Sequence, residues 1–339
     1  MPSVSPLASW NATKEVLDAH GLSTKHSLGQ NFLVNDGVLA HILQLSEACD
    51  EDVVLEVGPG IGTLSLALLP HVSHLISVEA DTDLPAVLTD TCAAYASDRF
   101  TLFSMDALKL TEADLVADAR GAAGVEAVAD VQGAAGVEAS VGSRSSALVP
   151  GFAPLPQRLP NKLISNLPYA VAATLVLDYF QRFPFIQSMT VMVQKEVADR
   201  MCADIGCKDY GAYTVKLRLY ADFVGRFPVS PGNFFPPPRV DSAVVRFDRR
   251  GAGDELGDLT EEDRAWACLM ADAAFAARRK TISNSCKSFF SRYGGTYGRI
   301  VEDLPAIFAD AGIDPRRRGE TLTLADFVLL GKLAKAVID

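Results

Sequence analysis

The feature that most restricts the fold of this chain is a buried strand that runs through a glycine-rich turn into a helix. Residues 53–57 are apolar except for Glu56, the turn 58–62 reads GPGIG, and residues 64–69 have a helical pattern. Glycines let a backbone turn tightly and let a ligand approach without a Cβ atom in between. The alternative is a tight turn that holds no ligand. Either interpretation predicts an α/β sheet.

Further strands alternate with helical segments along the chain. Apolar runs predict strands at 75–78, 100–103, 163–164 and 189–193. Helical patterns occur at 10–20, where Asn11 is the expected cap, and after residue 250 at 265–277, 301–311 and 324–337. This order predicts a doubly wound, mostly parallel, Rossmann-like sheet with a smaller C-terminal helical domain.

Changes in composition suggest where the domains begin and end. We expect an N-terminal extension at 1–24, a sheet domain at 25–250 and a helical domain at 256–339. The stretch 117–158 is rich in alanine and glycine and contains the sequence GAAGVEA twice. Two copies are too few for a repeat protein, so we interpret this stretch as a flexible surface insertion in the sheet domain.

Composition argues against several classes of protein. No apolar run approaches the roughly 18 residues of a membrane span. The first residues lack a basic segment followed by a long apolar one, so we expect no secretory signal. The six cysteines are scattered without a Cys-x-x-Cys pair, and the five histidines form no metal-binding motif. We therefore expect a cytoplasmic protein with reduced thiols and no metal.

Two acidic residues follow the second and third predicted strands. Glu79 ends the second strand, where a carboxylate can accept hydrogen bonds from both hydroxyls of a ribose. Asp106 follows the third strand and can accept a hydrogen bond from the amine of an adenine. Alternatively, Glu79 is an ordinary surface residue and Asp106 caps the next helical turn. Together with the glycine turn, the two carboxylates indicate a nucleoside ligand at the sheet edge.

The fourth strand ends in the run Asn166-Leu167-Pro168-Tyr169. The side-chain oxygen of Asn166 and the carbonyl of Leu167 can each accept one N–H of an adenine amine. Pro168 stiffens this corner and contributes no competing donor, and Tyr169 can stack on the base. Alternatively, Asn166 caps the next helix and Tyr169 is a core residue. The combination favours methyl transfer to an amine over hydride transfer, for which we find no catalytic arrangement.

Basic residues are segregated in this acidic chain, whose net charge is −11. Residues 273–301 contain six cations and no carboxylate, and three arginines follow at 316–318. Such runs are either solvated helix faces or the contact surface for a folded nucleic acid. The overall charge argues against tight binding to naked RNA, because neutralising phosphates requires lysine and arginine.

The combined motifs resemble those of class I S-adenosylmethionine-dependent methyltransferases that act on adenine amines. More narrowly, the chain resembles the KsgA family, the adenine N6,N6-dimethyltransferases of small-subunit ribosomal RNA. The similar motifs are LGQNFL at 28–33, QKEV at 194–197, YG at 210–211, FPPPRVDSAVV at 235–245 and RRKT at 278–281. The resemblance covers about 25–330, except for the insertion.

The resemblance implies the site residues. The S-adenosylmethionine contacts would be Asn31, Leu33, Gly58, Gly60, Glu79, Asp106 and Asn166. The target amine would be held by Asn166, Leu167, Pro168 and Tyr169, with Phe234 as a second aromatic beside the base. The alternative for the segment around Phe234 is a rigid loop with core aromatics. Arg278, Arg279 and Lys280 would bind RNA.

The resemblance also implies the substrate: two adjacent adenosines in the 3′-terminal hairpin of 16S rRNA, each methylated twice in an assembling small subunit. We expect a monomer acting on a preassembled particle. Three rival interpretations are a relative that methylates large-subunit rRNA, a non-catalytic assembly factor and a nicotinamide-dependent oxidoreductase. The basic helical tail argues against the first, and the intact 166–169 run and Glu79 against the second.

Overall fold

The computed structural model describes residues 3–24, 30–116, 147–251, 253, 256–292 and 296–338. Positions 28–29 of the first family motif and residues 117–146 of the predicted insertion lie outside the described residues. Two compact units are present. The first comprises Met1–Val171 and Ser230–Arg239, and the second Ala172–Val229 and Val240–Asp339. The boundaries of these compact units differ from those of the domains expected at 25–250 and 256–339. The assignment of separate functions to the expected domains stays a prediction.

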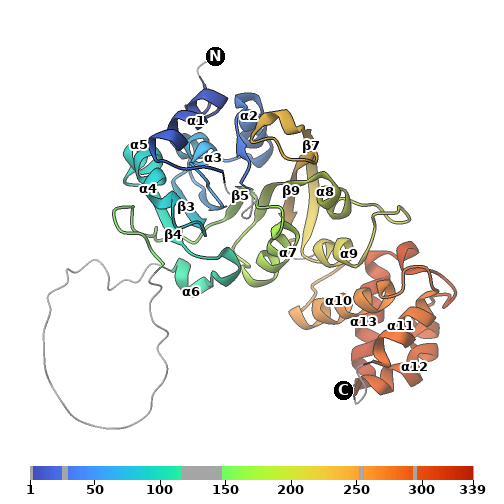
Figure 1. Ribbon diagram of the computed structural model, residues 1–339. Coiled ribbons are helices and arrows are strands. Elements are labelled where there is room, and N and C mark those ends of the chain that lie inside the picture. The colour runs from blue at the N-terminus through green and yellow to red at the C-terminus, as the bar shows by residue number, and fades with distance from the viewer. Residues whose placement is uncertain are drawn as a thin grey trace, which may run out of the picture. The chain divides into compact units, whose positions relative to one another are not determined.

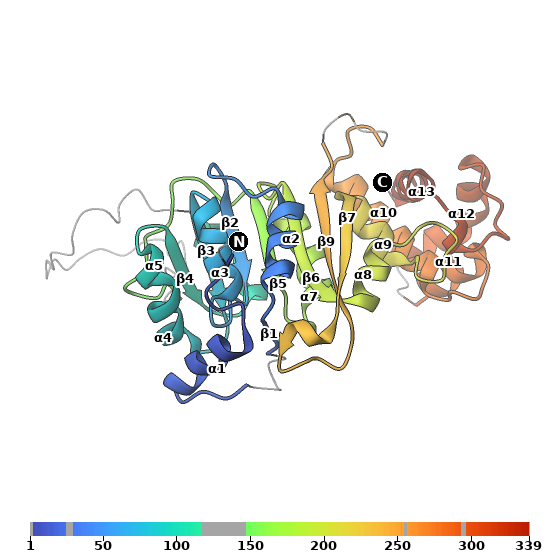
Figure 2. The ribbon, with the colours of Figure 1, turned by 90° about the horizontal axis from the view of Figure 1, so that it is seen from above.

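The helices of the first unit and its strands β3, β4 and β5 are labelled in Figure 1, and β1 and β2 in Figure 2. Its helices are α1 (Trp10–Ala19), α2 (Asp36–Ser46), α3 (Thr63–Leu68), α4 (Leu84–Leu88), α5 (Ala94–Ala96) and α6 (Glu112–Leu115). Its strands are β1 (Phe32–Leu33), β2 (Val53–Val57), β3 (His74–Glu79), β4 (Phe100–Ser104), β5 (Lys162–Asn166) and β8 (Phe234–Phe235).

The second unit contains three strands and more helix. Its strands are β6 (Ser188–Gln194), β7 (Ala221–Val229) and β9 (Ser242–Arg249). Its helices are α7 (Ala172–Arg182), α8 (Lys195–Met201), α9 (Ala212–Arg218), α10 (Glu261–Phe275), α11 (Ile282–Phe290), α12 (Thr296–Asp310) and α13 (Leu324–Ile338).

The strand order is β4-β3-β2-β5 in the first unit and β6-β9-β7 in the second. In the first unit, β2 pairs in parallel with β3 and β5, and β3 pairs in parallel with β4. Every residue of β2 and β3 is buried, as expected for parallel strands covered by helices on both faces. The predicted doubly wound sheet and its helical C-terminal part are confirmed.

In the second unit β6 corresponds to the strand predicted at 189–193, whereas the sequence did not reveal β7 and β9. β9 pairs antiparallel with both β6 and β7, and β7 lies beside β9 in both views (Figures 1 and 2). β7 is largely exposed and contains Gly225 and Pro228, which are uncommon in strand interiors and argue against a strand at the level of sequence. It is the last strand in the order, where proline is tolerated.

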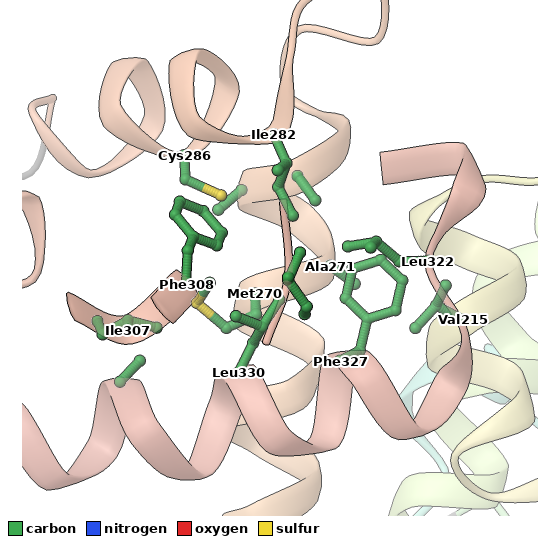
Figure 3. Close-up of a cluster of buried hydrophobic side chains, with 14 of the residues drawn as sticks. Val215, Met270, Ala271, Ile282, Cys286, Ile307, Phe308, Leu322, Phe327 and Leu330 are labelled. Carbon is green, nitrogen blue, oxygen red and sulfur yellow. The ribbon is translucent and has the colours of Figure 1, made fainter. Parts of the chain in front are cut away.

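The helices α10 to α13 share a hydrophobic core, to which Val215 of α9 also contributes. Figure 3 shows Met270 and Ala271 of α10 facing Phe327 and Leu330 of α13, all of them buried. Helix α10 begins with a capping box in which Thr260 and Asp263 satisfy each other's backbone N–H groups. Helix α11 lies within the basic stretch, inside the helical domain expected at 256–339.

Two segments of the first unit correct expectations from the sequence. Helix α1 is capped by Ser9, whose Oγ accepts the N–H of Ala12 at 3.2 Å, so the expected cap at Asn11 is wrong. Residues 147–153, the described part of the supposed insertion nearest β4, pair with that strand. The Val149 and Ala153 N–H groups donate to carbonyls of β4 at 2.9 Å, which fixes this end of the segment to the sheet.

Candidate active site

A cavity of about 290 Å³ lies in the first unit at the carboxyl ends of the parallel strands. This is the edge where open α/β sheets bind ligands. Ten of the predicted residues line it: Asn31, Leu33, Gly58, Gly60, Glu79, Asp106, Asn166, Leu167, Pro168 and Tyr169. They come from segments far apart in the sequence, and the parallel pairing of β2 with β3 and β5 brings them together.

The glycine-rich turn forms one wall of the cavity. Gly60 has a φ angle of 61°, and its N–H donates a hydrogen bond to Glu79 Oε2 at 3.3 Å. A Cβ atom at Gly60 would lie 3.0 Å from a ring carbon of Phe32, and one at Gly58 would lie 3.4 Å from Cδ of Pro168. Side chains at these positions would therefore fill the space between the turn and the opposite wall.

Glu79 is held in place by the backbone around it. Besides its bond to Gly60, its Oε1 accepts the N–H of Asp81 at 2.8 Å. The side chain is buried, and this burial raises the pKa of Glu79 above its ordinary range. Each carboxylate oxygen keeps a further lone pair for another donor. The geometry fits a ligand that offers two hydroxyls, such as a ribose.

Of the two interpretations of Asp106 that the sequence left open, the structure shows the cap, and the contact with an adenine amine stays a prediction. Its Oδ1 accepts the N–H of Leu108 at 3.0 Å and caps the short 3₁₀ turn Ala107–Lys109, so the capping role is confirmed. The side chain is exposed and also lines the cavity. One carboxylate oxygen is therefore used by the cap, while the other has no hydrogen-bond donor within the described part of the chain.

The corner 166–169 forms the facing wall. The side-chain amide of Asn166 donates to the carbonyl of Asn31 at 3.3 Å, which turns Oδ1 of Asn166 away from that carbonyl. Within the described residues, neither this Oδ1 nor the carbonyl of Leu167 accepts a hydrogen bond. Tyr169 is half-buried at the same edge. Two acceptor oxygens and an aromatic ring thus meet at one side of the cavity.

Phe234 departs from the expected arrangement. It forms β8 with Phe235 and pairs with Leu33 of β1, and its side chain is 0% exposed. It does not line the cavity. The alternative of a core aromatic therefore describes Phe234 in this structure, and a stacking role would require the ring to move.

Two further polar groups line the cavity that sequence reasoning had not assigned. Glu56 lies on β2 and receives hydrogen bonds from the hydroxyls of Ser65 and Ser77. Thr63 at the start of α3 has a buried hydroxyl without a hydrogen-bond partner in the structure as described. The signal for Glu56 was visible, since it is the one carboxylate in an otherwise apolar strand.

The predicted RNA-binding residues belong to the second unit and are described there by themselves. Arg278, Arg279 and Lys280 are all exposed in the turn that follows α10. The Arg278 guanidinium contacts Glu320 at 3.4 Å, a weak and solvent-exposed ion pair. The turn thus offers cationic side chains to a ligand in solvent.

Neither a metal site nor a membrane helix emerges from the residues described. No group of three or more histidine, cysteine, aspartate or glutamate side chains is placed there to hold a metal ion. No helix in the same residues has the length and apolar character needed to cross a membrane.

Comparison with known proteins identifies the family of the chain. The family model for ribosomal RNA adenine dimethylase matches residues 21–304. The chain is 37% identical to a ribosomal RNA small subunit methyltransferase A from Acidothermus cellulolyticus, over 94% of this chain and 92% of the relative. A protein of the same name from Thermobifida fusca is 34% identical, over 92% of this chain and 91% of the relative.

Solved structures share the fold. A dimethyladenosine transferase from Plasmodium falciparum superposes with a TM-score of 0.63 at 20% identity, covering 88% of this chain and 95% of that one. The 23S rRNA methyltransferase ErmE superposes with a TM-score of 0.57 at 19% identity, covering 90% of this chain and 100% of that one. The extent of the family match, the identities and the cavity lead to one conclusion: the chain belongs to the ribosomal RNA adenine dimethylase family and is an S-adenosylmethionine-dependent rRNA methyltransferase.

Proposed function

We propose that this chain dimethylates the N6 amines of two adjacent adenosines in the 3′-terminal hairpin of 16S rRNA, in the cytoplasm, while the small subunit is being assembled. The observation that carries the proposal is the pair of available acceptors, Asn166 Oδ1 and the Leu167 carbonyl, at the edge of the cavity. Two acceptors are what an amine with two N–H groups requires.

The residues of the cavity fit the cofactor. Glu79 would accept hydrogen bonds from the ribose hydroxyls, and the free oxygen of Asp106 would accept one from the adenine amine. Gly58 and Gly60 leave room for the cofactor backbone, because no Cβ atom stands between the turn and the facing wall. When bound, the cofactor supplies an electrophilic methyl group attached to a positively charged sulfur.

The protein's contribution to the reaction is to orient the target amine. The lone pair of an adenine N6 is delocalised into the ring, which makes the amine a poor nucleophile. Acceptance of both N–H groups by the Asn166 and Leu167 oxygens would hold the nitrogen so that its lone pair faces out of the ring plane. Catalysis then rests on positioning and electrostatics, and the proton leaves after the amine has become cationic.

The target base must leave its stack to reach this corner, as in other enzymes that modify bases. Tyr169 is half-buried at the cavity edge and can receive the flipped base by stacking, worth roughly 1–3 kcal/mol per base. Phe234 would contribute only after rearrangement, because its side chain is fully buried between its neighbours.

Contact with the RNA would come from the exposed cations of the helical region. Arg278, Arg279 and Lys280 can bind phosphates, and double-helical RNA is recognised mainly through shape and backbone. With a net charge of −11 the chain repels a bare polyanion, so an assembling particle that offers several simultaneous contacts is the better substrate.

Labelled methyl transfer tests the proposal directly. The full chain is mixed with S-adenosylmethionine labelled in the methyl group and with immature small subunits, mature small subunits or large subunits. We expect label only in the immature small subunits, recovered as N6,N6-dimethyladenosine at two neighbouring positions near the 3′ end of 16S rRNA. Label in large-subunit rRNA would support the rival methyltransferase, and binding without label would support an assembly factor.

A further inference from the structure

Glu56 is a buried carboxyl group in the wall of the cavity. It is 1% exposed, lies at the carboxyl end of β2 and lines the cavity. Both of its hydrogen bonds, from Ser65 at 2.6 Å and Ser77 at 3.0 Å, go to one oxygen, Oε2. Its Oε1 accepts no hydrogen bond from the described residues.

A second polar group that lacks a hydrogen-bond partner among the described residues lines the same cavity. The hydroxyl of Thr63 is one of three buried side-chain polar atoms without a partner in the described residues. Thr63 begins α3, directly after the glycine turn, and lines the cavity together with Glu56. Two unpartnered polar groups in one cavity wall point to a polar ligand that completes them.

The groups that face Glu56 are neutral or negative. They are the hydroxyls of Ser65 on α3 and Ser77 on β3, the carboxyl of Glu79 at the end of β3, and the thiol of Cys92 in the π-helical turn Thr89–Ala93. Burial, more than any neighbour, raises the pKa of Glu56 to about 7, and Glu79 adds to the shift. At neutral pH this carboxyl is therefore divided between its protonated and ionised forms.

We propose that Glu56 senses the positive charge of the bound cofactor and gives up its proton when the cofactor binds. The O–H bond of the carboxyl breaks, the electron pair stays on the carboxylate, and the proton passes to the buffer. This inference rests on the cavity being the cofactor site. It makes S-adenosylmethionine binding a proton-releasing step and makes affinity dependent on pH near neutrality.

The sign and size of the effect follow from linkage. A cation stabilises the carboxylate, so affinity rises with pH as Glu56 ionises. If the pKa is about 7 in the free chain and the carboxyl is fully ionised in the complex, binding at pH 7 releases about half a proton, and affinity increases about tenfold between pH 6 and pH 8. Above pH 8 the carboxyl is already ionised and the dependence disappears.

Calorimetric titration with S-adenosylmethionine, in buffers of different ionisation enthalpy, counts the released protons without any turnover. Wild type should release about half a proton at pH 7. Glu56→Gln, which keeps the size and the acceptor for the two serines, should release none and bind more weakly with a flat pH profile. Ser77→Ala removes a hydrogen bond that lowers the pKa of Glu56, so its midpoint should move to higher pH.

Glu79→Gln is the matched control for the second buried carboxyl in the cavity. It should weaken binding while proton release persists. The proposal is overturned if wild type binds without releasing a proton, or if release survives in Glu56→Gln and vanishes in Glu79→Gln. If Glu56→Gln does not fold, the pH midpoint of cofactor affinity in Ser77→Ala tests the role of Glu56 independently. Absence of any cofactor binding by wild type would instead refute the cavity as the cofactor site.

Discussion

The cavity of the first unit and the basic turn of the second present charge in opposite ways. In the cavity, Glu56 and Glu79 are buried and held by short hydrogen bonds to hydroxyls and backbone N–H groups. In the turn, Arg279 and Lys280 extend into solvent. Burial fixes a group and shifts its pKa, whereas exposure leaves a cation mobile and screened by salt. We therefore expect selective cofactor recognition and adaptable RNA recognition.

The largest expected effect tests positioning at the cavity edge. Asn166→Ala removes one of the two acceptors for the target amine, and we expect the rate of methyl transfer in a single turnover to fall by roughly 10²–10³-fold, as for loss of one preorganised polar group. The measurement uses saturating cofactor and pre-bound small subunits, so that weaker binding does not mimic slower chemistry.

Asn161→Ala is the matched control at the other end of β5. Asn161 accepts the N–H of Val53 at 2.9 Å and donates to Asp52 at 2.7 Å, away from the cavity. This variant should be less stable but should transfer methyl groups at the normal rate per folded molecule. A near-normal rate in Asn166→Ala would refute the role of that residue.

The next effect is a loss of stability at low pH, caused by a buried histidine in the first unit. His74 is buried beside Thr101, its Nε2 lying 2.7 Å from the threonine hydroxyl, and burial lowers the pKa of His74 to about 4. The unfolded chain takes up a proton below about 6.5, while the folded chain does not. The free energy of unfolding should therefore fall as pH drops from 6.5 to 4, by ~3 kcal/mol in total.

Denaturant titrations at several pH values measure this loss. In His74→Gln the acid sensitivity over that range should shrink by the same amount. If wild type and His74→Gln lose the same free energy of unfolding as the pH falls, burial of His74 is not the cause of the acid sensitivity.

A smaller effect is expected at the glycine turn. Gly60→Ala places a Cβ atom near Phe32 and an alanine at a φ of 61°, which costs on the order of 1–2 kcal/mol. Cofactor affinity should fall about tenfold, because the turn and its bond to Glu79 must shift. Gly206→Ala carries a similar strain at φ 85° in open space, and cofactor affinity should be unchanged there. Calorimetry compares the two.

The smallest effect is expected in the basic turn. Replacing Arg279 and Lys280 by alanine should weaken binding to small subunits and reduce the slope of log affinity against log salt by about one per lost phosphate contact. Cofactor affinity should stay unchanged. The control is Arg316→Ala, an exposed arginine already paired with Asp314 at 2.9 Å. A salt slope as steep as that of wild type would show that the turn does not contact phosphate.

The residues of the cavity were predictable from the sequence because the polar ones directly follow the ends of strands. The parallel sheet was predictable from alternating apolar runs, and a parallel sheet places Glu79, Asp106 and Asn166 at one edge whatever the details of packing. The alternative role of Asp106 as a cap was also predictable, because a carboxylate directly after a strand can accept a backbone N–H of the next turn.

Other features depend on contacts between distant segments and were not readable from the chain. Strand β7 carries Pro228 and exposed residues, so only its pairing with β9 reveals it. Phe234 looked available in a proline-rich loop, yet pairing with Leu33 buries it. Glu56 is visible in the sequence as the one carboxylate of an apolar strand, but only the fold brings the hydroxyls of Ser65 and Ser77 to one of its oxygens.

A crystal structure of the chain soaked with S-adenosylmethionine tests the central claim most directly. We predict cofactor density in the cavity, with the ribose hydroxyls within hydrogen-bond distance of Glu79 and the methyl group facing the Asn166 and Leu167 oxygens. Cofactor bound elsewhere, or bound in the cavity with its methyl group directed away from residues 166–169, would contradict the account.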